Sequence, residues 1–258
     1  MAGYGDELIA TGLARGAHAR GKRIALGDGK LIKWGPFSKE IFKNNPNIAV
    51  PGSERDKDVE WVPYYKGNRI YNVGHGTHWT WNYDFHPAPG EMFFDEEELT
   101  FAETLPSGLV FVEPNTPWHK PVAPNKAWSF SKYQQVTDVL LAAGYPVVQF
   151  AVGRDRLAHV QTIKTPSFRH SLAVVKRAAL VVTPEGGLHH GTAAVGTRAV
   201  VIFGGFVPPA STGYDIHINL TGGAKKFCGR LTPCQHCRDA MAAITVDEVV
   251  SSALSILK

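Results

Sequence analysis

The residues best suited to chemistry lie in the segment Pro184-Glu-Gly-Gly-Leu-His-His190, between two apolar runs. The pattern predicts a strand, a glycine turn, a short Ala-rich helix and a second strand. Such a turn faces the N-terminus of the helix, where backbone N–H groups and the helix dipole bind anions. Open α/β sheets also take their ligands outside the carboxyl ends of the strands. The segment therefore predicts an anion site in which Gly186 and Gly187 offer N–H groups beside His189 and His190.

The elements that position this segment follow a regular order after Gly108. Strands are predicted at 108–114, 146–151 and 180–184 and helices at 129–143 and 167–177, and a further strand ends before Gly204. Alternating strands and helices indicate a doubly wound parallel sheet. Thr245 and Glu248 form a capping-box pattern that starts a C-terminal helix.

The first hundred residues are less regular. They begin with a predicted helix at 5–20 and a predicted strand at 22–26, and residues 30–106 mix short apolar runs with Pro, Gly and aromatics. We therefore expect two domains, residues 1–106 and 107–258. Residues 74–87 are dense in aromatic and polar groups. This composition suits stacking on sugars or nucleobases and equally suits the core of a small loop-rich domain.

Composition narrows the range of functions. The 258 residues carry a formal net charge of +4 and no block of five or six Lys/Arg residues. This weighs against nucleic-acid binding and suits a small anionic ligand equally well. No apolar run reaches the ~18 residues that span a bilayer, and the N-terminus lacks signal-peptide features. We expect a cytoplasmic protein without a membrane span.

The three cysteines, Cys228, Cys234 and Cys237, fall within ten residues, with His236 among them. An odd count outside a secreted context argues against a disulfide framework. The spacing has some character of a metal site, but a tetrahedral zinc site needs four ligands. Reduced thiols in a packed turn are favoured, and the cluster is a weak candidate for a structural metal.

Four motifs in order give the second half of the chain a family resemblance. They are Glu113-Pro-Asn-Thr116 with Lys126-Ala-Trp128, the strand and glycine loop at 144–154, the turn at 184–189 with the Phe203-Gly-Gly strand, and Cys234-Gln-His-Cys237. Together they resemble glycosyltransferase family 9, the heptosyltransferase-like enzymes of bacterial lipopolysaccharide assembly. The match covers roughly residues 108–258. Gly5-Asp6 also resembles the Gly-Asp pair of the family's first loop.

The resemblance implies two Rossmann-like domains of the GT-B type, with the N-terminal domain reduced and irregular. It implies an inverting, metal-independent transfer of a sugar from a nucleoside diphosphate sugar, ADP-linked or similar, to a glycan-type acceptor. No cofactor is required. The acceptor would bind the N-terminal domain and the donor the C-terminal domain.

Site residues carry over from the family motifs one by one. Asp6 becomes the general base, with a helix cap as its alternative role, and Lys126 stabilises the leaving diphosphate. Glu185 is assigned to catalysis or to a donor hydroxyl. The remaining donor-binding candidates are Asn115, Thr116, Arg154, Gly186, Gly187, His189 and His190.

Two departures from the family bear on catalysis. Pro184 and Glu185 stand where the family's turn carries Asp and Ser, so the carboxylate is displaced by one residue, and the chain is shorter than typical members. Two alternatives follow. One is a non-catalytic nucleotide- or glycan-binding protein on a degenerate GT-B scaffold. The other is a GT-B-type sugar-nucleotide epimerase that uses Glu185 and His189 as acid and base.

Overall fold

A six-stranded parallel sheet forms the centre of the protein in a computed structural model that describes residues 3–63, 68–117 and 119–258. Its strands are β6 (Val110–Val112), β7 (Val147–Phe150), β8 (Gln161–Ile163), β9 (Leu180–Pro184), β10 (Ala199–Ile202) and β11 (Ile218–Leu220). They lie in the order β11-β10-β9-β6-β7-β8. The chain winds outward from β6 in one direction and from β9 in the other. The gap between β6 and β9 is therefore the switch point at which doubly wound folds bind ligands.

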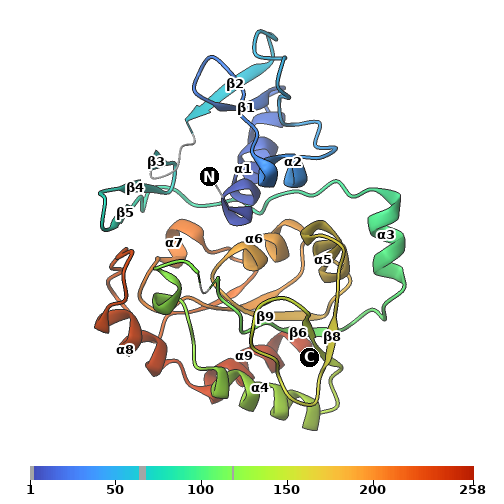
Figure 1. Cartoon of the computed structure of the whole chain (residues 1–258), viewed down its shortest axis with the longest axis vertical. Helices are drawn as coiled ribbons and strands as arrows, with labels where there is room; N and C mark the ends of the chain where they lie inside the picture. Colours follow the sequence, from blue (N-terminus) through green and yellow to red (C-terminus); the bar gives the residue numbers. More distant parts are fainter. Residues whose placement is uncertain (1–2, 64–67, 118) are drawn as a thin grey trace.

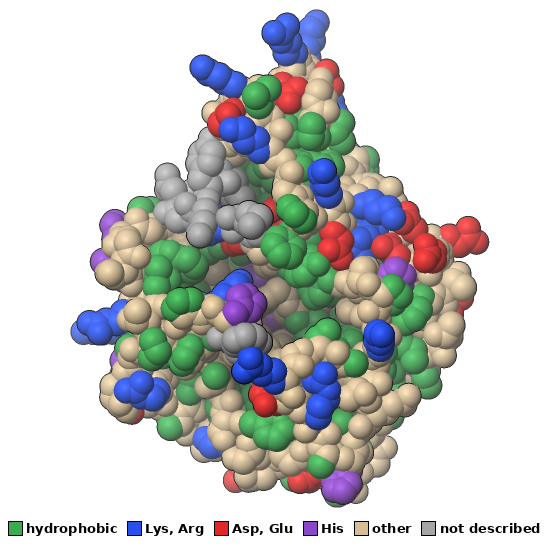
Figure 2. Space-filling view, in the orientation of Figure 1, with side chains coloured by type: hydrophobic (Ala, Val, Ile, Leu, Met, Phe, Trp, Pro, Cys, Tyr) green, Lys and Arg blue, Asp and Glu red, His purple; other side chains and the backbone are tan. Residues whose placement is uncertain are grey.

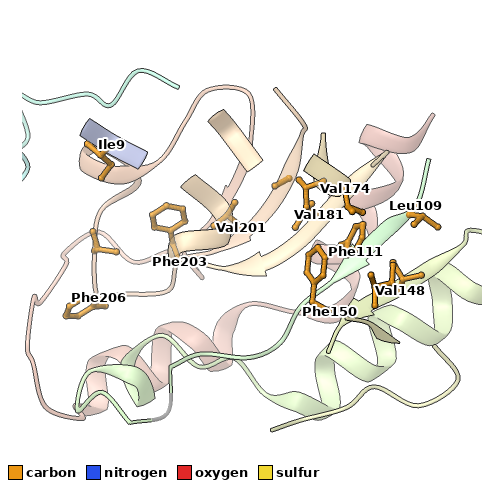
Figure 3. Close-up of a cluster of buried hydrophobic side chains, with 14 of the residues drawn as sticks. Ile9, Leu109, Phe111, Val148, Phe150, Val174, Val181, Val201, Phe203 and Phe206 are labelled. Carbon is orange, nitrogen blue, oxygen red and sulfur yellow. The ribbon is translucent and has the colours of Figure 1, made fainter. Parts of the chain in front are cut away.

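Helices cover both faces of this sheet (Figure 1). One face packs against α4 (Phe130–Ala142) and α9 (Val246–Leu257), and the other lies under α5 (Phe168–Val175) and α6 (Gly187–Ala194). Alternate strand residues serve the two faces, because successive side chains of a strand point to opposite sides. Phe111, Val181 and Val201 belong to the α5 side, where they form the core drawn in Figure 3. Burial on both faces explains why these strands are almost wholly apolar.

The N-terminal region is smaller and holds a two-stranded parallel sheet of β1 (Arg23–Gly27) and β2 (Val59–Pro63). The helices α1 (Tyr4–His18), α2 (Pro36–Ile41) and α3 (Glu96–Glu103) accompany it. A separate antiparallel sheet contains β3 (Asn68–Arg69), β4 (Asn72–Gly74) and β5 (Trp79–Trp81). Helix α1 packs against α6, and this contact brings the N-terminus of α1 to the carboxyl edge of the large sheet.

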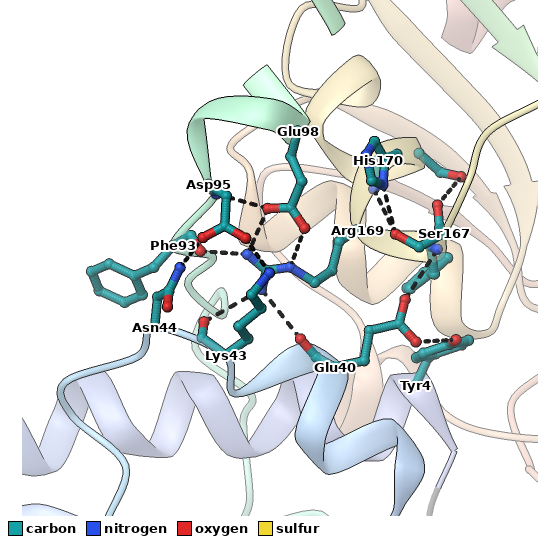
Figure 4. Close-up of polar contacts among 12 residues, drawn as sticks. Tyr4, Glu40, Lys43, Asn44, Phe93, Asp95, Glu98, Ser167, Arg169 and His170 are labelled. Carbon is teal, nitrogen blue, oxygen red and sulfur yellow. Dashed lines mark hydrogen bonds and ion pairs between the residues drawn. The ribbon is translucent and has the colours of Figure 1, made fainter. Parts of the chain in front are cut away.

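One buried arginine joins the two regions (Figure 4). Arg169 on α5 is 2% exposed and binds the Glu98 carboxylate of α3 through two nitrogens. Its guanidinium also donates to the backbone carbonyls of Glu40, Lys43 and Phe93 in the N-terminal region. A guanidinium with this many acceptors is satisfied without water. Arg169 therefore fixes α5 against the N-terminal region.

Most of the predicted elements are present within a few residues of their expected ends, and the Thr245 hydroxyl accepts the Glu248 N–H at 3.1 Å. The strands β2, β8 and β11, the β3–β5 sheet and the helices α2 and α3 were not predicted. The domain limit between residues 106 and 107 falls between α3 and β6 and stays a prediction.

No single helix in the described part of the chain is long and apolar enough to cross a membrane. Helices α8 (Gln235–Ala243) and α9 have the length and apolar composition of a span only when taken together, and they are bent by 58° relative to each other. Helix α9 packs against β9 and β10. The cytoplasmic location stays a prediction.

Candidate active site

A cavity of about 310 Å³ lies at the carboxyl ends of β6 and β9. The start of α1 and the β4–β5 hairpin also contribute to its walls. Figure 2 shows Lys and Arg side chains, with a histidine among them, in the middle of the face of the molecule that is turned to the viewer. The lining residues used below are Asp6, Tyr71, Trp79, Trp81, Glu113, Asn115, Thr116, Lys120, Lys126, Glu185, Gly186, Gly187 and His190. The cavity therefore joins the predicted base, the predicted cation and the glycine turn, which are far apart in sequence.

Lys126 and Glu185 form an ion pair at the centre of the site. Their side chains are only 17% and 6% exposed. Burial alone would raise the pKa of Glu185, but Lys126 and the two neighbouring histidines more than offset it and hold this pKa below its usual range. Glu185 is therefore ionised at neutral pH, and Lys126 is held by a carboxylate from the glycine turn.

The glycine turn brings α6 close to α1. A Cβ on Gly187 would lie 3.2 Å from the Cβ of Tyr4, so a larger residue here would press α1 away from the cavity. The N–H of Gly186 donates to Nδ1 of His189 at 3.2 Å. Both glycines line the cavity at the N-terminus of α6, as the sequence predicts for an anion site.

The two histidines of α6 have different surroundings. His189 is fully buried and its Nε2 donates to the Thr212 carbonyl at 2.9 Å, so both ring nitrogens contact backbone groups. Burial holds the pKa of His189 well below its usual range. His190 lines the cavity, shares a 2.8 Å hydrogen bond with the Tyr214 hydroxyl and lies 3.7 Å from Glu185. The structure therefore supports a ligand contact for His190 and a structural role for His189.

This difference corrects the register of the family motif. In the family's Asp-Ser-Gly-x-x-His turn the histidine follows the aspartate by five positions, and His190 follows Glu185 by the same five positions. The glycine then falls at Gly187 instead of Gly186. In this register an acid occupies the acid position, so the displacement inferred from Pro184 disappears.

Asn115 and Arg154 connect two loops beside the site through a hydrogen bond. The side-chain oxygen of Asn115 accepts the backbone N–H groups of Arg154 and Asp155, both at 3.0 Å. Asn115 and Thr116 line the cavity as expected. Arg154 is exposed, and its backbone is the part that contacts Asn115. Its role in donor binding stays a prediction.

Asp6 lies in the cavity wall at the start of α1. Its carboxylate accepts the Gly3 N–H at 2.7 Å and the Tyr71 hydroxyl, and it lies 3.1 Å from the Arg69 guanidinium. The Gly3 contact is the helix cap that was its alternative role. Because Asp6 both caps α1 and faces the cavity, its role as a base stays a prediction.

Two groups in the cavity wall were not selected from the sequence. Glu113 follows β6 and is 5% exposed, and burial raises the pKa of its carboxyl to about 7. Trp79 and Trp81 line the opposite side with Tyr71. The dense aromatics of residues 74–87 pointed to the tryptophans without separating a ligand surface from a core, and Glu113 was quoted only as part of a motif.

The cysteines lie outside the cavity lining. The sulfur of Cys228 is 3.2 Å from that of Cys237 and 3.5 Å from that of Cys234. The Nε2 of His236 contacts the Lys226 carbonyl at 2.9 Å instead of joining the three sulfurs. Three thiols at this separation could hold a metal ion, and a structural metal here stays a weak candidate.

The fold and the site together define the class of protein: an α/β protein with a doubly wound sheet and a ligand cavity at its switch point. The family model for glycosyltransferase family 9 (heptosyltransferase) matches residues 77–241, more than half of the chain. The chain therefore belongs to glycosyltransferase family 9.

Solved structures of low sequence identity share the fold. A family 9 glycosyltransferase from Veillonella parvula superimposes with a TM-score of 0.63 at 14% identity, covering 99% of this chain and 95% of that one. The iron-containing dodecameric glycosyltransferase TibC from enterotoxigenic E. coli gives 0.57 at 13% identity, with coverages of 92% and 79%. The match to E. coli ADP-heptose lps heptosyltransferase II gives 0.48 at 16% identity and spans 65% of this chain and 53% of that enzyme. No curated protein sequence matches the chain.

These comparisons confirm the predicted family and the GT-B-like α/β fold. Family membership supports the expected enzyme class, a glycosyltransferase.

Proposed function

We propose that this protein transfers a sugar from a nucleoside diphosphate sugar to a hydroxyl group of a glycan-type acceptor. The observation that carries the proposal is the shared cavity. Lys126 and the N-terminus of α6 lie on the side of the large sheet, and Asp6 lies on the side of α1. One side suits a diphosphate and the other a hydroxyl that loses its proton.

On the donor side, Lys126 would bind the diphosphate while Glu185 holds its ammonium group in place. Gly187, at the N-terminus of α6, adds a backbone N–H donor and the positive end of the α6 dipole. Preorganised donors of this kind stabilise the charge that develops on a leaving group. The proposed reaction assigns no role to a metal or cofactor. The ADP-D-beta-D-heptose in a TibC structure makes an ADP-linked sugar the first donor to test.

On the acceptor side, the proposed step is a single inverting displacement. The acceptor oxygen forms a bond to the anomeric carbon as the bond from that carbon to the diphosphate oxygen breaks. The diphosphate leaves with the electron pair, and the acceptor proton moves to the Asp6 carboxylate. Tyr71 and Arg69 orient this carboxylate. Trp79, which is only partly buried, offers aromatic surface on which a sugar ring packs.

A ligand screen tests the donor assignment. ADP, UDP, GDP and CDP at millimolar concentration should include one that raises the melting temperature, because a ligand that binds only the folded state stabilises it. If all four leave the melting temperature unchanged, the nucleotide-based function is wrong.

Catalysis is tested separately, by release of the nucleoside diphosphate from the cognate nucleotide sugar with an acceptor. Asp6→Asn should abolish transfer and leave nucleotide binding intact. Asp84→Asn is the matched control, since Asp84 is exposed on the loop after β5. Transfer that survives in Asp6→Asn would refute the base assignment.

A non-catalytic binding protein remains the second candidate because of one observation. Asp6 and Lys126 are both held by protein partners, Asp6 by an arginine and Lys126 by Glu185. Tight nucleotide binding with no release from any nucleotide sugar would favour this candidate. The epimerase alternative loses support, because both ring nitrogens of His189 contact backbone groups.

A further inference from the structure

Glu113 has a carboxyl group that is only half used by the protein. It follows β6 at the switch point, lines the cavity and is 5% exposed. One oxygen, Oε1, accepts the backbone N–H of Asn115 at 3.1 Å and its side-chain amide at 2.7 Å. The other oxygen, Oε2, is buried and has no hydrogen-bond partner among the residues that the structure describes.

The carboxyl group is also held rigidly. Asn115, which fixes Oε1, is itself anchored by the N–H groups of Arg154 and Asp155. Glu113 therefore cannot turn to find a partner for Oε2 without breaking bonds in two loops. A buried polar atom without a partner costs about 1–3 kcal/mol. This atom belongs to a residue that lines the cavity, and such an unsatisfied group calls for an explanation.

Burial of Glu113 favours its neutral form. Burial raises the pKa of its carboxyl to about 7, and the contacts from Asn115, the side chain of Gln149 and the charge of Arg156 offset only part of that effect. Tyr133 on α4 is the titratable group behind it, and it is neutral because burial raises its pKa. Lys126, a cation of the cavity wall, is already paired with Glu185. An anionic diphosphate in the cavity would disfavour the ionised form of Glu113 further.

We propose that Glu113 is a donor-binding residue whose Oε2 carries a proton and donates a hydrogen bond to an acceptor atom of the bound nucleotide sugar. The inference rests on the proposed function, because the ligand is the nucleotide sugar assigned to this cavity. An ionised carboxylate only accepts hydrogen bonds, whereas a protonated carboxyl donates one. Glu113 is thus a neutral donor beside the ionised Glu185.

The test is the pH dependence of nucleotide affinity in the full chain. Calorimetric titrations at pH 6, 7 and 8 use whichever of ADP, UDP, GDP or CDP stabilises the protein. If only the protonated form binds, a group with a pKa of about 7 loses affinity about tenfold between pH 6 and pH 8. This loss adds to any titration of the nucleotide itself. Glu113→Gln should bind within about threefold of wild type at pH 6 and lack the tenfold component. Glu113→Ala should bind about tenfold more weakly at pH 6.

Glu7→Gln is the matched control. Glu7 is also buried with a pKa raised to about 7, but its carboxylate accepts the Ser38 hydroxyl and lies outside the cavity lining. Its variant should keep the wild-type pH slope. The titration of the nucleotide is the same for every protein, so it cancels in the comparison.

The outcomes distinguish a failure of the role of Glu113 from a failure of the proposed function. If wild type binds no nucleotide, both are wrong. If wild type binds but Glu113→Gln keeps the same pH slope, only the role of Glu113 is wrong. Should Glu113→Ala fail to fold, Glu113→Gln decides, since it preserves the shape of the side chain.

Discussion

Replacing Lys126 with methionine isolates the energy of the buried ion pair at the centre of the site. Methionine keeps most of the packing volume and removes the charge. Glu185, whose side chain is 6% exposed, then has a buried carboxylate without its cation. Such a group relieves the imbalance by taking up a proton. The cost of the substitution is therefore set by the free energy of protonating Glu185.

This cost depends on pH in a defined way. From an ordinary pKa of 4.5, protonation at pH 7 costs about 3.4 kcal/mol, at 1.36 kcal/mol per unit. The value agrees with the ~3–5 kcal/mol expected when one partner of a buried pair is removed. At pH 5 the same calculation gives about 0.7 kcal/mol.

The contribution of Glu185 to stability changes with pH in opposite directions in wild type and in Lys126→Met. In wild type the folded pKa of Glu185 is lowered, so its stabilisation is present above pH 4.5 and is lost as pH falls through the folded value. In Lys126→Met the folded pKa of Glu185 is raised, so the destabilisation grows as pH rises above 4.5.

Urea denaturation at pH 5 and pH 7 measures the difference. Lys120→Met is the matched control, because Lys120 also lines the cavity but is exposed, and its loss should cost little at either pH. The double variant Lys126→Met/Glu185→Gln should regain most of the stability lost at pH 7. A Lys126→Met penalty that is equal at pH 5 and pH 7 would refute the reasoning.

Four further substitutions probe the scaffold by urea denaturation. Gly12→Ala should cost about 1–3 kcal/mol, because its Cβ would lie 2.4 Å from the Ala88 carbonyl oxygen, whereas Gly16→Ala on the same helix meets nothing within 4 Å and should stabilise by about 0.5–1 kcal/mol; equal effects would contradict the close approach. Arg169→Met should lower the free energy of unfolding by about 3–5 kcal/mol, because it leaves the buried Glu98 carboxylate and several carbonyls unpaired. A loss below about 1 kcal/mol would be evidence against the role of Arg169 in joining α5 to the N-terminal region. Glu7→Gln should stabilise by up to about 3 kcal/mol at pH 8 and by little at pH 5. The reason is that the raised pKa makes wild-type stability fall as pH rises from 4.5 to about 7, and a constant difference across this range would refute it.

The sequence predicted the elements whose signals are local. The apolar run before Pro184 and the two glycines after it mark a strand and a helix start within a few neighbours in the chain. The structure confirms β9 and α6 at these positions. Short strands such as β8 and β11 have three residues each, which is too few for periodicity to distinguish them from loop.

The side-chain partners could not be predicted in the same way. Lys126 and Glu185 are 59 residues apart, and their contact depends on the packing of a loop against a strand end. His189 and His190 are neighbours in sequence, but adjacent residues of a helix point about 100° apart. Which of them faces the cavity depends on how α6 is rotated on the sheet. Two motif registers fitted the letters equally well at glycine and histidine. The register that places Glu185 at the acid position also places His190 beside it in the structure.

The charge states of the cavity wall explain why carboxylates can surround an anionic ligand. Glu185 is neutralised by Lys126, and Asp6 lies against the Arg69 guanidinium. Glu113 is partly protonated at neutral pH, because burial raises its pKa to about 7. The acidic side chains named in the lining therefore contribute little net negative charge, and the N-terminal amides of α6 can attract a diphosphate without strong repulsion. Glu113 and Glu185 lie at neighbouring strand ends, and their surroundings shift their two pKa values in opposite directions, as is common for paired acidic groups in active sites.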